Sequence, residues 1–316
     1  HENVGEMDLR IEYLDYFDTI NEENLILCLG FFDGLHKAHQ ALVKKGQILK
    51  KEKNYKLAVL TFDRSIKLFM QNKPFYFLTS IEDKAEILKD FDVDILYVMK
   101  VSYDLIKNSP EGFIEQFLKN IKICIAGEDF TFGYKSLGKV SLLKQCKYFE
   151  TIVIKEITYH GVKVGSTRIR EDLYLGDIES ANFLLGRPYK ISGTVIKGHG
   201  IGKHLGFPTA NIDFTDYLLP KLGVYFTIVE IQGVDYYAMT NVGKRPTFND
   251  SKITLESYIF DFNKEIYSEV IKIKFIKFLR QEYYYETVDA LIKQIEDDKM
   301  LVLELIEERE NNAQIR

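Results

Sequence analysis

The chain has 316 residues, of which 46% are hydrophobic and 28% are charged, and its formal net charge is −5. At about 100–200 residues per domain, this length predicts two domains or one large one. The apolar content excludes a disordered chain, and the acidic balance argues against a dedicated nucleic-acid binder, which usually carries a basic excess.

Neither a membrane span nor a disulfide framework is expected from the sequence. The longest apolar stretch, residues 25–32, is far shorter than the roughly 20 residues that a spanning helix needs. Cys28, Cys124 and Cys146 are few and odd in number, and the first two lie in apolar runs, where thiols pack as small hydrophobes. These features predict a reduced cytoplasmic protein with no signal segment, zinc site or membrane partner.

The first half of the chain alternates strand-like apolar runs with amphipathic helical patterns. Strands are expected at 25–29, 57–61, 95–99, 121–126 and 151–157. Helices are expected between them, at 39–51, 81–90, 111–120 and 140–148. This alternation predicts an α/β domain with a Rossmann-like parallel sheet, whose ligands lie at the carboxyl ends of the strands.

The pattern changes after Gly186-Arg187-Pro188, where strand-like runs follow one another without helices. They are expected at 189–197, 224–231, 236–242, 254–260 and 270–278. Consecutive short strands predict a small antiparallel β-barrel. An apolar face with a period of 3.6 residues, from Val288 to Ile306, predicts a terminal helix. We therefore expect two domains, 7–186 and 187–316.

A glycine-bearing turn joins the first expected strand to the first expected helix. Gly30 and Gly34 allow a phosphate to approach the backbone, and the helix N-terminus offers free N–H groups. His36 and His39 are three residues apart, so on a first helical turn they point the same way. Two imidazoles there can bind the oxygens of one phosphate as charge develops. The alternative is a tight turn with two partly exposed histidines.

Two further segments have a composition suited to phosphate. Ser166-Thr167-Arg168 precedes an expected helix, although these residues are also ordinary cap and surface residues. Gly198, Gly200, Gly202 and Gly206 form a glycine-rich loop after the first barrel strand, with backbone N–H groups that can wrap a phosphate. The alternative for this loop is a long hairpin connection that ends in an edge strand.

Thr209 and Asn211 follow the glycine-rich loop and share one face of an extended segment. A hydroxyl and an amide oxygen are hard ligands, suited to Mg²⁺ with a bound phosphate. Glu256 alternates with Leu255 and Ser257 on an expected strand, so it faces away from them. A carboxylate there can act as a general base, although a solvent-facing Glu is the commoner case. Tyr258 and Phe260 share its face, and we expect both to pack.

The first-half motifs resemble the nucleotidyltransferases with a His-x-Gly-His signature. Within that family they are most similar to the adenylyltransferase module of prokaryotic bifunctional riboflavin kinase/FAD synthetases, in which segments 127–133 and 166–170 recur in the same order. The resemblance implies that Asp129 and Phe130 line the flavin cleft. It also implies an ATP site formed by Gly30, Phe32, Asp33, Gly34, His36, His39, Ser166, Thr167 and Arg168.

The chain departs from that family in three binding segments. Ala38 stands at the signature glycine, Arg64-Ser65-Ile66 replaces a Pro-His-Pro, and Gly165 replaces the first serine of Ser-Ser-Thr. The second departure is the largest, because it removes two rigid prolines and an imidazole. We therefore expect adenylyl transfer that is weaker than the family norm.

Segments 205–211, 241–248 and 254–262 resemble the riboflavin kinase signature, in the family's order. The resemblance implies that Glu256 is the base, that Thr209 and Asn211 hold Mg²⁺, and that Arg280 lies near the flavin, with a surface arginine as the alternative. The glycine-rich loop would bind ATP together with Lys203, which replaces the usual arginine and lacks its fork geometry.

Together the two resemblances imply a bifunctional flavin-cofactor enzyme. It would use Mg²⁺ and ATP to convert riboflavin to FMN, and a second ATP to convert FMN to FAD. Its partners would be these small molecules, with no nucleic acid, and it would be a monomer or weak homo-oligomer. The alternatives are a riboflavin kinase with a degenerate first domain and a non-catalytic flavin-binding regulator. The presence of Thr209, Asn211 and Glu256 argues against the regulator, since flavin binding alone needs no base.

Overall fold

The computed structural model describes residues 9–198, 206–246, 251–283 and 285–314. The chain forms two compact units that divide between Arg168 and Ile169. The sequence pattern placed the boundary near residue 186, so the two positions differ over one short stretch. This stretch holds most of α7 (Ser166–Leu175) and all of α8 (Ile178–Leu185), which are grouped with the second unit.

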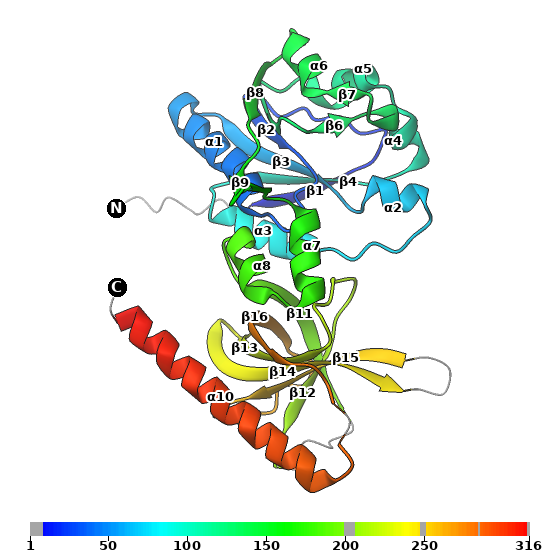
Figure 1. Ribbon diagram of the computed structural model, residues 1–316. Coiled ribbons are helices and arrows are strands. Elements are labelled where there is room, and N and C mark those ends of the chain that lie inside the picture. The colour runs from blue at the N-terminus through cyan, green and yellow to red at the C-terminus, as the bar shows by residue number, and fades with distance from the viewer. Residues whose placement is uncertain (1–8, 199–205, 247–250, 284, 315–316) are drawn as a thin grey trace. The chain divides into compact units, whose positions relative to one another are not determined.

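The first unit is built on a six-stranded parallel sheet in the order β1-β4-β3-β2-β5-β8 (Figure 1). The strands are β1 (Arg10–Leu14), β2 (Leu25–Leu29), β3 (Lys56–Phe62), β4 (Ile95–Met99), β5 (Ile123–Gly127) and β8 (Glu150–Ile154). The predicted parallel α/β fold is confirmed. The edge strand β1 was not expected, because Arg10 and Glu12 interrupt its apolar pattern.

Helices cover both faces of this sheet, which explains why β2 and β4 are buried along their whole length. The helices are α1 (Lys37–Lys53), α2 (Ile66–Met70), α3 (Ile81–Lys89), α4 (Tyr103–Lys107), α5 (Pro110–Phe113), the π-helical η1 (Ile114–Leu118) and α6 (Val140–Gln145). Alternate residues of the four central strands, β2, β3, β4 and β5, belong to two separate cores. Leu27 packs in the core that contains Phe117 of η1, whereas Cys28 packs in the core that contains Val43 of α1.

The strand order reverses between β2 and β5, which makes this point the topological switch of the sheet. Ligands of open α/β sheets bind outside the carboxyl ends of the strands at such a point. The turn that leads into α1 follows β2, and the segment that begins with Glu128 follows β5. The fold therefore places two of the predicted binding segments at one crevice position.

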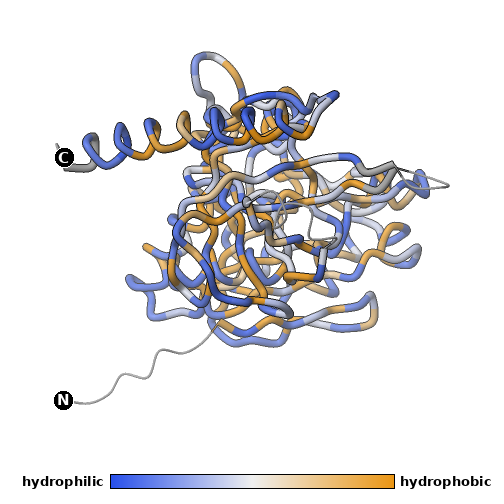
Figure 2. Tube along the Cα trace, turned by 90° about the horizontal axis from the view of Figure 1, so that it is seen from below, coloured by the Kyte–Doolittle hydropathy of each residue, from blue (hydrophilic) through white to orange (hydrophobic). Residues whose placement is uncertain are grey.

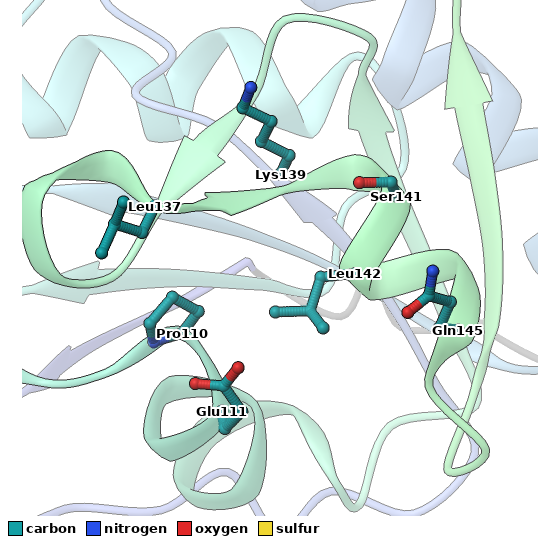
Figure 3. A pocket seen from close by; sticks show the side chains of 7 residues that line it. All are labelled: Pro110, Glu111, Leu137, Lys139, Ser141, Leu142 and Gln145. Carbon is teal, nitrogen blue, oxygen red and sulfur yellow. The ribbon is translucent and has the colours of Figure 1, made fainter.

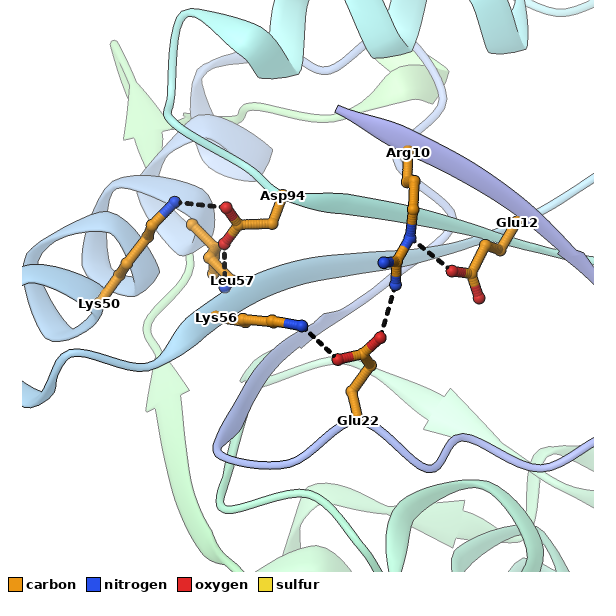
Figure 4. A network of polar contacts seen from close by, with 7 residues as sticks. All are labelled: Arg10, Glu12, Glu22, Lys50, Lys56, Leu57 and Asp94. Atoms are coloured by element: carbon orange, nitrogen blue, oxygen red, sulfur yellow. Dashed lines mark hydrogen bonds and ion pairs between the residues drawn. The ribbon is translucent and has the colours of Figure 1, made fainter. Parts of the chain in front are cut away.

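At the opposite edge of the sheet, ion pairs hold the beginnings of the strands (Figure 4). Glu22 accepts hydrogen bonds from Arg10 at 2.5 Å and from Lys56 at 2.7 Å. Lys50, near the end of α1, donates to Asp94 at 2.8 Å, and the second oxygen of Asp94 accepts from the backbone of Leu57. These contacts join residues at the amino ends of the strands. The predicted site lies at the carboxyl ends.

The second unit contains a closed antiparallel barrel in the order β11-β12-β15-β14-β13-β16. The strands are β11 (Tyr189–Ile196), β12 (Thr209–Asp213), β13 (Gly223–Ile231), β14 (Val234–Pro246), β15 (Ser251–Ile259) and β16 (Val270–Arg280). The predicted barrel is confirmed. Its strand β12 is the extended segment that was expected to carry Thr209 and Asn211.

The terminal helix α10 (Val288–Gln314) packs on the outer face of the barrel. Hydrophilic and hydrophobic residues alternate along this helix (Figure 2), and its Val302 and Ile306 are buried in one cluster with Phe260. Tyr258 packs against the same cluster, so the expectation that Tyr258 and Phe260 pack is confirmed. The aromatic face of β15 is thus largely used to hold α10.

Small secondary elements complete the first unit. They are β6 (Thr131–Phe132), the 3₁₀ turn η2 (Tyr134–Ser136), β7 (Gly138–Lys139), β9 (Thr158–Tyr159) and β10 (Val162–Lys163). β6 and β7 form a hairpin, and β9 and β10 form another. Both hairpins lie between β5 and α7 in the chain, and β6 belongs to segment 127–133, which the resemblance assigns to the flavin cleft.

Candidate active sites

The turn between β2 and α1 has an unusual backbone. Phe32, Gly34 and Leu35 all have positive φ angles, of 51°, 83° and 44°. Glycine adopts this conformation freely, but Phe and Leu do so only when the surrounding structure compensates the strain. The Phe32 and Leu35 side chains are completely buried, which supplies that compensation. Strain of this kind clusters at ligand-binding sites, as the sequence interpretation of this turn requires.

The structure brings His36 and His39 together at the start of α1. Their rings stack, with centroids 3.6 Å apart and an angle of 16° between the planes. His36 is the N-cap residue, and its Nδ1 accepts a hydrogen bond from the backbone N–H of His39 at 3.4 Å. An accepting Nδ1 leaves the ring proton of a neutral imidazole on Nε2. His36 therefore offers its Nε2–H group at a helix N-terminus, where anions are favoured.

Asp33 and Ser166 join the turn to the start of α7. The Ser166 hydroxyl donates to the backbone carbonyl of Asp33 at 2.8 Å, so residue 166 contacts the turn directly. The Asp33 carboxylate is buried and accepts from the backbone N–H of Leu78 at 2.8 Å. Thr167 is exposed and Arg168 is partly buried. The Asp33 carboxylate therefore anchors the turn to Leu78. We expect any contact of Asp33 with phosphate to involve its backbone.

Asp129 and Phe130 follow β5, as expected, but their environments differ. The Asp129 side chain is 64% exposed and forms an ion pair with Lys163 at 2.5 Å. The hydrogen bonds that Lys163 donates to Asp129 and Glu156 raise the pKa of Lys163. Phe130 is partly buried and lies parallel to Phe132, with ring centroids 5.9 Å apart. The short segment after β5 thus presents an exposed carboxylate, from Asp129, next to a partly buried aromatic ring, from Phe130.

Two of the sequence departures have structural explanations. Ala38 lies inside α1 and does not have a positive φ angle, so its methyl group favours the helix. Ser65 caps α2, and its Oγ accepts from the N–H of Leu68 at 3.4 Å. Arg64 pairs with Asp63 at 3.3 Å. The segment that replaces Pro-His-Pro is therefore a locally stabilised helix start.

A cavity of about 370 Å³ lies beside the β6–β7 hairpin (Figure 3). Its lining consists of Pro110, Glu111, Leu137, Lys139, Ser141, Leu142 and Gln145. None of the predicted site residues is among them. The cavity is separate from the turn that carries the two histidines, so it supplies no further evidence for the site.

In the second unit, cross-strand register aligns the predicted kinase residues. Asn211 of β12 lies opposite Glu256 of β15, and Thr209 lies opposite Tyr258. Leu255 and Ser257 are buried in the barrel interior, where the Ser257 hydroxyl is 2.7 Å from that of Thr240. Glu256 therefore lies on the outer face, as the alternation of the strand indicated. The predicted base and a predicted metal ligand are direct neighbours there.

Asn211, Glu256 and Asn241 form one row across three neighbouring strands, here called the barrel row. The sequence interpretation did not assign Asn241 to the site. Asn241 of β14 lies opposite Glu256 on the other side of β15. Its Nδ2 donates to Glu282 at 3.0 Å, and its buried Oδ1 has no hydrogen-bond partner among the described residues. It belongs to the segment 241–248 that carries the resemblance, but only the strand register shows that it adjoins Glu256.

Only part of the glycine-rich loop can be placed. Gly198 lies so close to the Asn211 amide that a Cβ atom there would overlap it, and Gly206 has a φ angle of 85°. The positive φ angle favours glycine at position 206, and a side chain at position 198 would displace the Asn211 amide. Gly200, Gly202 and Lys203 lie outside the described residues. The described ends of the loop place its backbone against a predicted metal ligand.

Arg280 is bound by α10. Its Nε donates to both carboxylate oxygens of Asp298, at 2.9 and 3.0 Å, and its Nη2 donates to one of them at 2.7 Å. Burial lowers the pKa of Arg280 and the hydrogen bonds to Asp298 raise it, with a net increase. This ion pair attaches the terminal helix to β16. A flavin contact at Arg280 stays a prediction. It would involve parts of the guanidinium other than the N–H groups bonded to Asp298.

The residues of the row fit a magnesium site. Mg²⁺ prefers oxygen ligands, and proteins usually hold it through one or two side chains together with substrate phosphates. Asn211 offers an amide oxygen beside Gly198, Thr209 offers a hydroxyl on the same strand, and the buried Oδ1 of Asn241 has no hydrogen-bond partner among the described residues. In the described part of the chain, no three His, Cys, Asp or Glu side chains cluster as metal ligands. The donor set therefore suits a cation that is shared with a phosphate.

Two protein-family models match the chain, and each match falls within one unit. The riboflavin kinase model matches residues 185–306, and the FAD synthetase model matches residues 18–168. The protein is thus a transferase built from two modules. Separately, no helix among the residues that the structure describes has the length and hydropathy of a membrane span.

Curated relatives match nearly the whole chain. A protein of Listeria monocytogenes is 39% identical over 292 residues, covering 89% of this chain and 92% of its own length. One of Bacillus subtilis is 35% identical over 284 residues, with coverages of 87% and 90%. Both are named bifunctional riboflavin kinase/FMN adenylyltransferase. The chain belongs to the bifunctional riboflavin kinase/FMN adenylyltransferase family.

A solved structure shares the fold over most of its length. It is a protein of Streptococcus pneumoniae, titled macrolide-efflux protein, with a TM-score of 0.84 and 30% sequence identity. The match covers 92% of this chain and 98% of the other. An α/β unit, a barrel and a terminal helix therefore recur, in this chain order, in a solved structure.

Proposed function

We propose that the barrel unit transfers the γ-phosphate of ATP to riboflavin, giving FMN, and that the α/β unit transfers AMP from a second ATP to FMN, giving FAD and pyrophosphate. The match of one family model to each unit carries this proposal. It favours two activities over a kinase with a degenerate first domain, and over a non-catalytic regulator. The proposed modules are residues 7–186 and 187–316.

In the kinase reaction, Glu256 accepts the proton of the primary hydroxyl of riboflavin as its oxygen attacks the γ-phosphorus and ADP leaves. Thr209 and Asn211 would hold Mg²⁺, which neutralises charge on the phosphates when bound. The register of Asn211 beside Glu256 supports this division of roles. The glycine-rich loop, including Gly198 and Gly206, would lie along the ATP phosphates.

In the adenylyl transfer, an FMN phosphate oxygen attacks the α-phosphorus of ATP and pyrophosphate leaves. His36 and His39 would donate hydrogen bonds to the ATP phosphates, helped by the free N–H groups of α1. Their stacked placement at the helix N-terminus supports this role. Thr167 and Arg168 would bind further phosphate oxygens, and Asp129 and Phe130 would line the flavin cleft.

We also propose a cytoplasmic monomer or weak homo-oligomer that acts on small molecules only, with no nucleic-acid or membrane partner. The net charge of −5 supports the first exclusion, since nucleic-acid binders usually carry a basic excess. Sedimentation with and without ATP and flavin tests the oligomeric state. A stable large assembly would contradict the proposal.

Chromatographic analysis of products tests both activities. The chain is incubated with ATP, Mg²⁺ and either riboflavin or FMN, alongside the variants His36→Ala and Glu256→Gln. We expect His36→Ala to lose FAD formation by about 10²–10³-fold, the effect of removing one preorganised donor, and to keep FMN formation. The regulator alternative predicts no ADP release with riboflavin. The kinase-only alternative predicts no FAD and no effect of His36→Ala.

A further inference from the structure

Lys84 of α3 is a buried cation to which the proposed mechanism gives no role. Its relative exposure is only 3%, and lysine is almost never buried to this degree unless it is paired. Burial lowers the pKa of Lys84 to about 8, although the nearby Asp33 carboxylate raises it. A cation at this depth is costly, so its contacts need a specific explanation.

The contacts of Lys84 converge on the β2–α1 turn. Its Nζ donates to the Thr61 hydroxyl at 3.1 Å and to the backbone carbonyl of Phe31 at 3.4 Å. The Thr61 hydroxyl donates to the same carbonyl at 2.5 Å. The ammonium also lies 5.5 Å from the centre of the Phe31 ring. Lys84 and Thr61 therefore clamp one carbonyl from α3 and from the carboxyl end of β3.

The clamped carbonyl immediately precedes the strained part of the turn. Phe32, Gly34 and Leu35 have positive φ angles, and His36 caps α1 directly after them. A strained turn keeps its conformation only when its surroundings fix it at several points. The described structure fixes this one at the Phe31 carbonyl, and also at Asp33, through Leu78 and Ser166. At the Phe31 carbonyl the donor is the ammonium of Lys84, so this point of attachment carries a positive charge.

We propose that Lys84 is a positioning residue for adenylyl transfer: its buried ammonium holds the β2–α1 turn so that His36 and His39 face the nucleotide phosphates. The proposal rests on the proposed adenylyl transfer and adds a residue to it. Lys84 acts through the backbone of Phe31 and does not touch substrate. Its charge also lies behind a turn that is to receive polyanionic phosphate, which strengthens the same site.

Lys84→Met tests this, with Lys50→Met as the matched control. Lys50 is a second, largely buried lysine of the same unit, but its ion pair with Asp94 lies at the amino edge of the sheet (Figure 4). We expect Lys84→Met to lower kcat for FAD formation by about 10²-fold, the cost of a small misplacement of catalytic groups, with little change in the KM for FMN. FMN formation by the same preparation should be unchanged. Lys50→Met should change neither reaction.

A second readout does not depend on activity. The ring-proton NMR signals of His36 and His39, assigned with His36→Gln and His39→Gln, should shift in Lys84→Met and stay in place in Lys50→Met. Thr61→Val keeps the lysine and removes one clamp, so it should shift them less and serves if Lys84→Met fails to fold. Unshifted signals in both Lys84→Met and Thr61→Val overturn the proposal. If wild type forms no FAD, the proposed adenylyl transfer fails, and the NMR signals still decide the role of Lys84.

Discussion

The two units build their candidate sites in different ways. In the α/β unit, His36 and His39 lie close in sequence, and one strained turn brings their rings together. In the barrel, Asn211, Glu256 and Asn241 are far apart in the chain and meet through the pairing of three strands. The first site therefore depends on the conformation of a few backbone bonds, and the second depends on strand register.

This difference teaches where each site is vulnerable. A turn held by a few contacts can lose its geometry while the sheet beneath it stays folded, as the clamp on the Phe31 carbonyl indicates. A slip of one residue in a strand would turn Glu256 into the barrel interior, so the register is fixed by the whole barrel. Substitutions in the barrel row should thus change the rate of the kinase reaction and leave the positions of the neighbouring strands almost unchanged.

Glu256→Gln is expected to have the largest effect. It keeps the size and strand position of the side chain and removes the base, so FMN formation should fall by roughly 10²–10⁴-fold. FAD formation from FMN should not change, because its site is in the other unit. The measurement is the rate of each reaction in one preparation. Kinase turnover near that of wild type would show that Glu256 is not the base.

Asp298→Ala tests whether Arg280 serves the barrel–helix contact. It leaves a largely buried guanidinium without its carboxylate, so the second unit should lose about 2–3 kcal/mol of unfolding free energy. Asp297→Ala, at the exposed neighbouring position, should lose almost none. Denaturant unfolding measures both. A stable Asp298→Ala variant with a raised KM for riboflavin would instead place the main role of Arg280 at the flavin.

Asn211→Ala is expected to weaken the use of Mg·ATP in the kinase reaction by about 10–100-fold, the usual cost of disturbing a metal site. FAD formation from FMN should be unaffected. Kinase rates as a function of Mg²⁺ concentration measure the change. Equal loss of both reactions would point to a damaged fold and would contradict a specific role of Asn211 in the kinase reaction.

Restoring the family residues in the first unit should have the smallest effect. Ala38→Gly combined with Pro-His-Pro at positions 64–66 should raise FAD formation by up to about tenfold, or 1.4 kcal/mol. Ala38→Gly alone should cost α1 about 1 kcal/mol, because residue 38 is helical. FMN formation serves as the control. No gain in FAD formation would mean that the helix start at Ser65 already serves this site.

Sequence patterns predicted the larger part of the fold. The alternation of apolar runs with helical patterns predicted the parallel sheet, and consecutive strand-like runs predicted the barrel. Both predictions were possible because the buried faces of a strand or helix produce a regular spacing of apolar residues in the sequence. β1 was missed because a short edge strand with charged residues has no such pattern. α8 was missed as well, and the position of the domain boundary near 186 was inferred from the change in pattern alone.

For the sites, the sequence by itself predicted which residues carry the chemistry: the two histidines, the glycine-rich loop, Thr209, Asn211 and Glu256. Residue type and spacing fix which donors and acceptors a short segment offers, and the family resemblance supplied the roles that these residues are predicted to have. Only the tertiary structure decided that Asn241 adjoins Glu256, that Arg280 binds Asp298, and that Lys84 lies beneath the histidine turn. Each of these contacts joins residues distant in the chain, and their proximity follows from strand register and helix packing, which no local pattern records.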